Sequence, residues 1–408
     1  MAIIKPFKGL RPKPELADQV ASRPYDVLSS EEARVEAKDN PYSFLHITKS
    51  EIDLPPGIDV HSQLVYQKAK ESLNRFIADK ILFQEDKPCY YVYELTMAGK
   101  SQTGLVCLSS VDDYVNDVIK KHEFTRPEKE KDRIDHMMST KAQTGNVFLA
   151  YRDVEELSTI VEEWKADHEP IYEFTAADVI GHVVWRIHEE AAVRPITEIF
   201  HSKVPVTYIA DGHHRAASAA KVSRQMASTQ SAKYFLTTIF PASELKILDY
   251  NRVVKDLNGL SVDEFLKKIE IDFTVEKAAE PCSPKKPHHF GMYVDRHWYI
   301  LTSRGATSPR DPVGILDVSI LSNDILDKVL GIKDQRTDAR IDFVGGIRGL
   351  SELERRVDNG EMRAAFSLHP VSIQQLFDIA DSGKTMPPKS TWFEPKLRDG
   401  LLTHMLDE

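Results

Sequence analysis

One stretch of sequence decides the fold of this chain: Val204-Pro-Val-Thr-Tyr-Ile-Ala-Asp211-Gly212-His213-His214-Arg215-Ala-Ala217. An apolar, β-prone run ends at Ala210, where an Asp-Gly pair follows, and the alanine-rich segment 216–222 is typical of a helix. The sequence therefore predicts a strand, a tight turn and a helix N-terminus at this place.

The predicted helix start carries the residue types of a phosphate site. The first backbone N–H groups of a helix lack intrahelical partners and the helix dipole is positive there, so an anion is favoured. Arg215 adds a planar, two-pronged donor for phosphate oxygens, and His213 and His214 can donate hydrogen bonds or move protons. The structural alternative is that Asp211 caps the helix and Arg215 pairs with a surface carboxylate. We favour the phosphate site, because packing and solubility require no pair of histidines beside an arginine.

A second polar motif, His-Glu-Phe-Thr-Arg-Pro, occupies residues 122–127. Thr125 is the predicted N-cap of a helix that has proline in its first turn. His122, Glu123 and Arg126 precede that helix, where a loop can present a base, an acid and a cation to a cleft. Phosphoryl transfer needs a carboxylate near the acceptor hydroxyl and cations around the transferring group, so Glu123 is the predicted base. A solvated, charged surface is the alternative.

A third motif, Lys-Ser-Thr-Trp-Phe-Glu-Pro-Lys, occupies residues 389–396. Lys389, Ser390, Thr391 and Lys396 provide two cations and two hydroxyl groups in an irregular segment that prolines and aromatic residues hold. Such a loop suits phosphate or carboxylate contacts with a substrate. An ordinary loop whose aromatic residues dock it on the core explains the segment equally well.

These motifs resemble those of two known groups of proteins. Segment 206–219 resembles the nucleotide-binding motif of the ParB/sulfiredoxin superfamily, in the Asp-Gly-His-His-Arg form of the free serine kinases. Over nearly its full length the chain is similar to the family DUF1015, through motifs at 24–27, 122–133, 211–215 and 386–396 in that order. The resemblance implies a ParB/sulfiredoxin-like core that binds an adenine nucleotide, ATP or ADP, with Mg²⁺. Sulfiredoxin-like chemistry is disfavoured, because histidines stand where its cysteine would fall.

Composition excludes several classes of protein. The chain has 408 residues, 41% of them hydrophobic, which is enough for two domains. A net charge of −10 opposes binding to a nucleic-acid backbone. No apolar run is long enough to cross a bilayer and no signal-peptide core follows the start, so we expect a cytoplasmic protein with no membrane or nucleic-acid partner. The three cysteines form no CxxC, which predicts neither disulfides nor a zinc cluster. The sequence is compatible with a homodimer.

We therefore expect a mixed α/β (α+β) enzyme. Residues 1–245 are the predicted catalytic domain, a ParB/sulfiredoxin-like core with an N-terminal elaboration. Residues 246–408 are the predicted C-terminal α+β region, which contributes the loop that begins at Lys389.

The predicted reaction is phosphoryl transfer between an adenine nucleotide and the hydroxyl of a small metabolite. Free L-serine and O-phosphoserine are the first pair to consider, in either direction of transfer. The predicted catalytic residues are Glu123, His213, His214 and Arg215, and Asp211 is the predicted Mg²⁺ ligand. Phosphate contacts are expected from residues 211–215 and Arg126, and substrate contacts from His122, Lys389, Ser390, Thr391 and Lys396. The alternative is a non-catalytic nucleotide-binding switch, although neither a helix-turn-helix nor a basic face is evident for a DNA-loading protein of that type.

Overall fold

The computed structural model describes residues 1–305 and 311–406, and the chain divides into two compact units. Unit 1 comprises Met1–Leu245 with Pro395–Glu408, and unit 2 comprises Lys246–Glu394. Each unit combines helices with strands, which confirms the predicted mixed α+β class. The segment from Pro395 onward, which the sequence-based division placed in the C-terminal region, lies in unit 1. It is held there by backbone pairing of β21 (His404–Met405) with β7 (Ala142–Gln143).

Unit 1 is built on a nine-stranded mixed sheet in the order β6-β11-β8-β12-β5-β4-β10-β9, with β1 paired to β5 beside this path. Strand β11 runs parallel to β6 and antiparallel to β8, and β12 runs parallel to β8. The strands are β1 (Ile4–Lys5), β4 (Tyr90–Met97), β5 (Lys100–Ser110), β6 (Ile119–Lys120), β8 (Val147–Tyr151), β9 (Tyr172–Thr175), β10 (Gly181–Ile187), β11 (Thr207–Asp211) and β12 (Tyr234–Pro241).

The hairpin of β4 and β5 follows directly from the turn chemistry of the sequence. Met97 pairs with Lys100, so the turn contains only Ala98 and Gly99. Both turn residues have positive φ, 50° and 74°, which is the geometry of a type I′ turn that matches the twist of paired strands.

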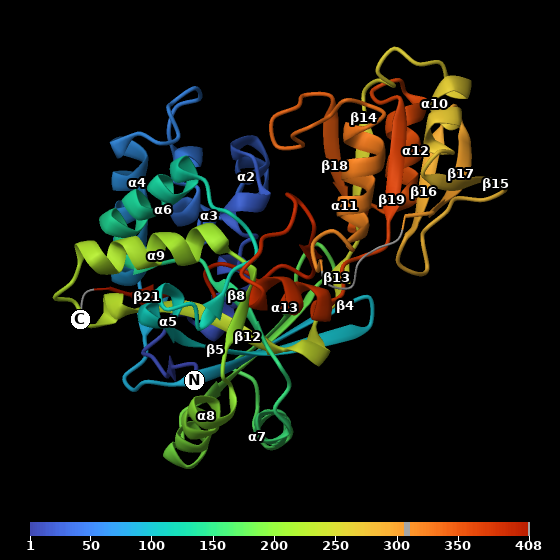
Figure 1. The fold of residues 1–408 in the computed structure, drawn as a ribbon. Coiled ribbons are helices and arrows are strands. Elements are labelled where there is room, and N and C mark those ends of the chain that lie inside the picture. The colour runs from blue at the N-terminus through green and yellow to red at the C-terminus, as the bar shows by residue number, and fades with distance from the viewer. Residues whose placement is uncertain (306–310, 407–408) are drawn as a thin grey trace. The chain divides into compact units, whose positions relative to one another are not determined.

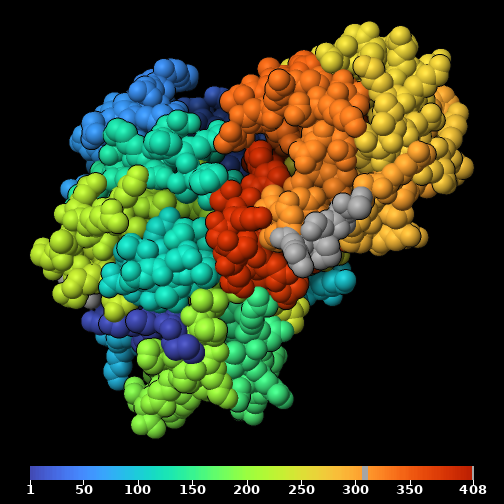
Figure 2. Space-filling model, in the orientation of Figure 1, coloured from blue at the N-terminus to red at the C-terminus, as the bar shows by residue number. Residues whose placement is uncertain are grey.

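Helices cover the sheet of unit 1, and three of them, α4, α6 and α9, lie side by side (Figure 1). Four alanines of α9 are buried, and such small side chains let this helix approach its neighbours and the sheet closely. In the space-filling view α5, α6 and α9 contribute to the visible surface of unit 1 (Figure 2). The longer helices are α4 (Gln63–Ala78), α6 (Pro127–Thr140), α7 (Glu155–Asp167), α8 (Glu190–Lys203) and α9 (His213–Gln225). The shorter elements are α1 (Ala17–Val20), α2 (Ser30–Glu36), α3 (Leu45–Thr48), α5 (Val111–Val115), β2 (Leu10–Pro12) and β3 (Leu82–Gln84).

Helix α6 begins one residue later than the sequence pattern predicts. Its N-cap is Arg126 and not Thr125, because Pro127 takes the first helical position. A residue before proline is kept out of the helical region, and Arg126 accordingly has φ −105° and ψ 128°. The backbone N–H of Arg126 therefore lies outside the helix.

Unit 2 contains a six-stranded antiparallel sheet in the order β15-β17-β16-β19-β14-β18. Helix α12 packs on it through Leu353, which joins a core with Val253 and Trp298. A short α11 is followed directly by a π-helical segment, Ser322–Asp327. The elements are β13 (Ile247–Leu248), β14 (Tyr250–Val254), α10 (Val262–Ile269), β15 (Phe273–Ala278), β16 (His289–Val294), β17 (His297–Ser303), α11 (Asp317–Leu321), β18 (Ile341–Gly345), α12 (Gly349–Asp358), β19 (Ala364–Leu368), α13 (Ile373–Asp381) and β20 (Trp392–Phe393).

Candidate phosphate site in unit 1

The predicted strand, turn and helix meet at Gly212. Strand β11 ends at Asp211 and α9 begins at His213, with Gly212 between them at φ 97°. A Cβ atom at this position would lie 3.2 Å from Arg215 Cζ and 3.4 Å from the Cα of Val147. Glycine is required here by both its conformation and its lack of a side chain. No side chain caps α9, so the first backbone N–H groups of this helix point outward from its N-terminus without a capping side chain.

Asp211 stands between two cations. Lys396 Nζ donates to Asp211 Oδ2 at 3.2 Å, and a terminal nitrogen of Arg215 lies 3.6 Å from the same oxygen. Burial acts to raise the pKa of Asp211, but Lys396 and Arg215 outweigh it and hold that pKa well below its usual range. The carboxylate is therefore ionised at neutral pH, while about a third of its side chain (34%) remains exposed.

Arg215 is held in one orientation by several acceptors. One terminal nitrogen donates to the carbonyl oxygen of Asn146, and the other lies 3.5 Å from Asp26 Oδ2. Burial acts to lower the pKa of Arg215, but Asp26 and Asp211 raise it, so the guanidinium stays charged. Its buried Nε has no hydrogen-bond partner among the described residues. The Pro-Tyr-Asp motif near the start of the chain is thereby brought to the site through Asp26.

Glu123, His213 and His122 form a second part of the site. The backbone N–H of His122 donates to Nε2 of His213 at 3.4 Å, and the two rings meet edge to face. Nε2 of His213 is therefore an acceptor, which places the ring proton on Nδ1. Nδ1 lies 3.8 Å from Glu123 Oε2. His213 is buried and Glu123 is half exposed, so this carboxylate lies near a buried ring and faces solvent.

Burial keeps both of these histidines neutral. It lowers the pKa of His122 to about 4, and it lowers that of His213 well below the ordinary value. Nδ1 of His122 is buried without a hydrogen-bond partner in the part of the chain that the structure describes.

His214 links α9 to the start of α6. Its Nδ1 accepts the backbone N–H of Arg126 at 3.3 Å, the donor that Pro127 leaves outside the helix. Burial, followed by the charge of Lys129, lowers the pKa of His214. The structure thus brings together the predicted residues His122, Glu123, Arg126, Lys396 and the loop 211–215.

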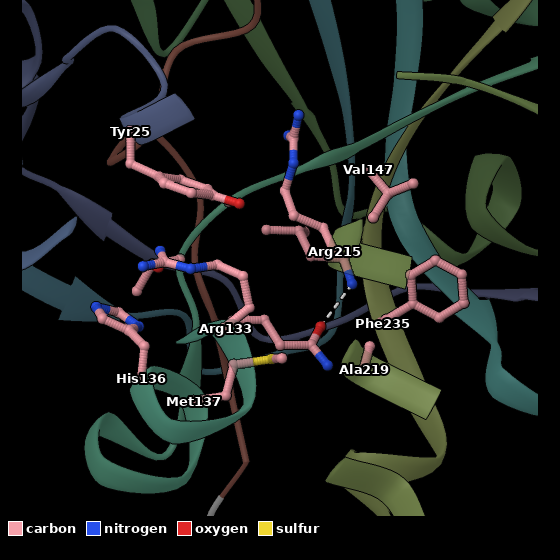
Figure 3. Close-up of a pocket in the computed structure, with 12 residues that line it drawn as sticks. Tyr25, Arg133, His136, Met137, Val147, Arg215, Ala219 and Phe235 are labelled. Atoms are coloured by element: carbon pink, nitrogen blue, oxygen red, sulfur yellow. Dashed lines mark hydrogen bonds between the residues drawn. The ribbon is translucent and has the colours of Figure 1, made fainter. Parts of the chain in front are cut away.

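A small pocket of about 30 Å³ adjoins Arg215 (Figure 3). Tyr25 and Arg133 form one side, with the guanidinium of Arg133 stacked 3.8 Å from the ring centre of Tyr25. The hydroxyl of Tyr25 points toward Arg215, and Val147, Ala219 and Phe235 line the opposite side (Figure 3). The volume admits one or two water-sized groups.

Asp399 is a residue of this region that the sequence did not identify. Its side chain is buried, with both carboxylate oxygens within 4 Å of where a side chain on Gly145 would begin. Burial raises the pKa of Asp399 to about 7, although Arg215 opposes that rise. No local pattern marks Asp399 in the sequence, because its neighbours come from residues far away along the chain.

Lys389, Ser390 and Thr391 belong to unit 2. Ser390 is buried and donates to the carbonyl oxygen of Pro387, and Lys389 Nζ lies 5.7 Å from the ring centre of Tyr250. The aromatic residues of this loop are also engaged within unit 2: Trp392 packs edge to face on Tyr250, and Phe393 pairs with Ile247. The aromatic residues thus hold this loop within unit 2, and the substrate contacts expected of Lys389, Ser390 and Thr391 stay a prediction.

Within residues 1–305 and 311–406, no three His, Cys, Asp or Glu side chains are grouped so that they could hold a metal ion. Asp211 supplies one ionised carboxylate, which fits a Mg²⁺ ion that arrives with nucleotide phosphates, since Mg²⁺ commonly uses one or two carboxylates beside them. In the same part of the chain, every helix is too short or too polar to cross a bilayer.

Solved structures similar to this chain share little sequence with it. A conserved hypothetical protein from Pyrococcus furiosus is 13% identical, with a TM-score of 0.36 over 73% of this chain and 94% of that one. A free serine kinase in complex with AMP is 12% identical, with a TM-score of 0.37 over 73% and 91% of the two chains. A kinase variant in complex with ADP gives 12% identity and a TM-score of 0.36 over 74% and 93%.

No curated protein matches the chain. The model of one protein family does match, over residues 4–319. The chain belongs to the family of proteins of unknown function DUF1015.

Proposed function

We propose that this protein is a nucleotide-dependent phosphotransferase that acts on the hydroxyl group of a small metabolite. The observation that carries the proposal is the N-terminus of α9, which no side chain caps: Asp211 is paired there with Arg215 and Lys396, and Glu123 lies 3.8 Å from Nδ1 of His213, the first residue of the helix. Helix N–H groups and two cations suit a nucleotide phosphate, and a half-exposed carboxylate beside them suits an acceptor hydroxyl.

The phosphate groups would be held by the loop from Asp211 to Arg215. Its backbone N–H groups are uncapped, and Arg215 and Lys396 supply positive charge that stabilises the transferring phosphoryl group. Asp211 would hold Mg²⁺, which neutralises phosphate charge when it is bound. Arg126 and His214, joined by a hydrogen bond, would extend the phosphate contacts to the start of α6.

Glu123 would accept the proton of the acceptor hydroxyl. His213 is buried with Nε2 engaged by the backbone of His122, so its Nδ1–H is left to orient Glu123. His213 thus acts as a positioning residue for the base, while His122 fixes the tautomer of His213. Free L-serine, with O-phosphoserine as its product or as the substrate of the reverse transfer, is the pair that the Asp-Gly-His-His-Arg resemblance implies.

A phosphorus NMR time course with Mg²⁺ tests the proposal. ATP with L-serine and ADP with O-phosphoserine are incubated separately with the protein and with Glu123→Gln and His213→Ala. Glu128→Gln is the matched control, since Glu128 is an exposed carboxylate in the first turn of α6. We expect transfer in at least one mixture, a loss of about 100-fold or more in Glu123→Gln, a smaller loss in His213→Ala and none in the control.

The alternative function is a non-catalytic nucleotide-binding switch. Nucleotide that binds but stays intact in both mixtures, with wild-type protein that is folded, would contradict phosphoryl transfer to serine. Transfer that persists in Glu123→Gln would remove Glu123 as the base.

A further inference from the structure

One aromatic ring of unit 1 is exposed to solvent. Among the phenylalanine, tyrosine and tryptophan side chains of the described residues, Phe124 alone is exposed, at 73%. The other rings are buried or partly buried, as the hydrophobic effect favours. A single exposed apolar residue is ordinary on a protein surface, so the place of this ring in the fold decides what it can do.

The loop that carries Phe124 is attached to the first turn of α9 on both sides of the ring. Glu123 Oε2 lies 3.8 Å from Nδ1 of His213, and the backbone N–H of Arg126 donates to Nδ1 of His214 at 3.3 Å. A chain extends by at most about 3.6 Å per residue, so the Cα of Phe124 is within about 7 Å of that of Arg126. The exposed ring is therefore held at the edge of the candidate phosphate site.

The residues that follow Phe124 are fixed as well. The hydroxyl of Thr125 hydrogen-bonds to the carboxylate of Glu130, and Pro127 begins α6 directly after the loop. Phe124 is thus exposed although the chain on either side of it is tied down. A ring presented by a fixed loop loses little conformational freedom when it contacts a ligand.

A second exposed apolar side chain adjoins another part of the site. Val27 is 39% exposed and follows Asp26, whose Oδ2 lies 3.5 Å from a terminal nitrogen of Arg215. His213 and Arg215 are two residues apart on α9, so their side chains project about 200° apart around the helix axis. Apolar surface therefore borders the polar first turn of α9 next to the contacts of both residues.

This arrangement suits a ligand that combines an anionic part with a flat apolar part. The uncapped N–H groups of α9 and the charge of Arg215 suit phosphate, and a phenyl ring suits the π-face of a nucleobase. A small hydroxylated metabolite such as L-serine has no flat apolar part.

We infer that the ring of Phe124 stacks on the base of the bound nucleotide. The inference rests on the proposed function for the place of the phosphates, and it adds the residue that holds the base. Because every base has a π-face, Phe124 supplies affinity for a base without choosing among bases.

Binding of ligands with and without a base tests the inference. Dissociation constants for ATP with Mg²⁺ and for tripolyphosphate with Mg²⁺ are measured by isothermal titration for wild type, Phe124→Ala and Phe124→Trp. Leu64→Ala is the matched control, because Leu64 is an exposed apolar residue (51%) on α4 of the same unit. We expect Phe124→Ala to bind ATP about tenfold more weakly and tripolyphosphate as wild type does. Phe124→Trp should bind ATP at least as well as wild type, and Leu64→Ala should bind both ligands unchanged.

Fluorescence of Phe124→Trp gives a second readout. The additional tryptophan emission, relative to wild type, should change on addition of ATP and stay constant on addition of tripolyphosphate, since only ATP carries a base that can stack on the indole. Constant emission with both ligands would contradict stacking.

Neither measurement requires phosphoryl transfer, so the inference and the proposed function can fail separately. A loss confined to ATP, in protein that transfers no phosphoryl group, would support stacking and contradict the phosphotransferase. Equal losses for ATP and tripolyphosphate would show that Phe124 only shapes the loop. Unchanged ATP affinity in Phe124→Ala would show that the base lies elsewhere. Either of these last two results would overturn the inference, even where phosphoryl transfer is observed.

Discussion

The ammonium group of Lys396 lies 3.2 Å from Asp211 Oδ2, although 185 residues separate the two along the chain. Lys396 is one-fifth exposed and reaches the end of β11 from the segment that returns to unit 1. The pair places a second cation beside the α9 N-terminus, in addition to Arg215, whose terminal nitrogen lies 3.6 Å from the same Asp211 oxygen. The charge of the site is therefore shared between residues from two distant parts of the sequence.

Replacing Lys396 by methionine is expected to weaken nucleotide binding about tenfold, or about 1.4 kcal/mol, because one phosphate-facing cation is lost. Isothermal titration with ATP and Mg²⁺ measures the change. Lys233→Met, at an exposed lysine of the same unit, is the control and should bind as wild type does. Equal affinity in Lys396→Met would show that Lys396 only balances the charge of Asp211.

Gly212→Ala is expected to destabilise the protein by more than about 1 kcal/mol and to reduce nucleotide affinity. The residue has φ 97°, and its new Cβ would lie 3.2 Å from Arg215 Cζ. Gly57→Ala is a matched control, since Gly57 has φ 85° with nothing within 4 Å of a Cβ, so it reports backbone strain alone. Urea unfolding of both variants gives the difference. A cost for Gly212→Ala no larger than that of Gly57→Ala would contradict the close approach to Arg215.

The free energy of unfolding is expected to depend on pH through Asp399. Burial raises the pKa of Asp399 to about 7; the charges of Arg215 and Arg133 oppose this rise, and the charge of Asp26 adds to it. Between about pH 4 and pH 7 the folded state therefore holds a proton that the unfolded state has lost. The contribution of Asp399 to stability therefore falls as pH rises from about 4 to about 7, by roughly 1.4 kcal/mol per pKa unit at most.

Asp399→Asn removes this contribution. The free energy of unfolding of Asp399→Asn relative to wild type should rise from about pH 4 to about pH 7. Urea unfolding at steps of half a pH unit measures this difference. For Asp211→Asn the stability relative to wild type should change with pH in the opposite direction. The pKa of Asp211 is held low in the folded state, so the stabilisation by its carboxylate is lost as pH falls. A difference between Asp399→Asn and wild type that stays constant with pH would show that Asp399 does not titrate in this range.

His122 is expected to make the protein sensitive to acid. Burial lowers its pKa to about 4, so the unfolded state takes up a proton near pH 6.5 that the folded state refuses. The stability that the neutral ring contributes is present above about pH 6.5 and is lost as pH falls toward 4. His122→Gln should show a shallower loss of Tm over this range than wild type, whereas His201→Gln, at an exposed histidine, should follow wild type. Parallel curves for His122→Gln and wild type would contradict the buried, neutral state of His122.

Local chemistry made several elements predictable. The strand, turn and helix around Gly212 follow from an apolar run, an Asp-Gly pair and an alanine-rich segment, and each of these signals acts within a few residues. The hairpin of β4 and β5 follows in the same way from its two-residue turn. Proline also decides the start of α6, where the restriction on the residue before Pro127 makes Arg126 the N-cap.

The composition of the site depends on contacts that no local pattern encodes. By itself the sequence determined that a strand ends at Asp211 and a helix begins after Gly212, because the backbone preferences at that place are properties of neighbouring residues. Only the tertiary structure decided that Lys396, Asp26 and Asp399 meet Arg215 and Asp211, and that His213 faces Glu123. The physical reason is that such pairs form when the whole sheet and the returning segment from Pro395 are packed, and this packing is set by the summed burial of residues throughout unit 1.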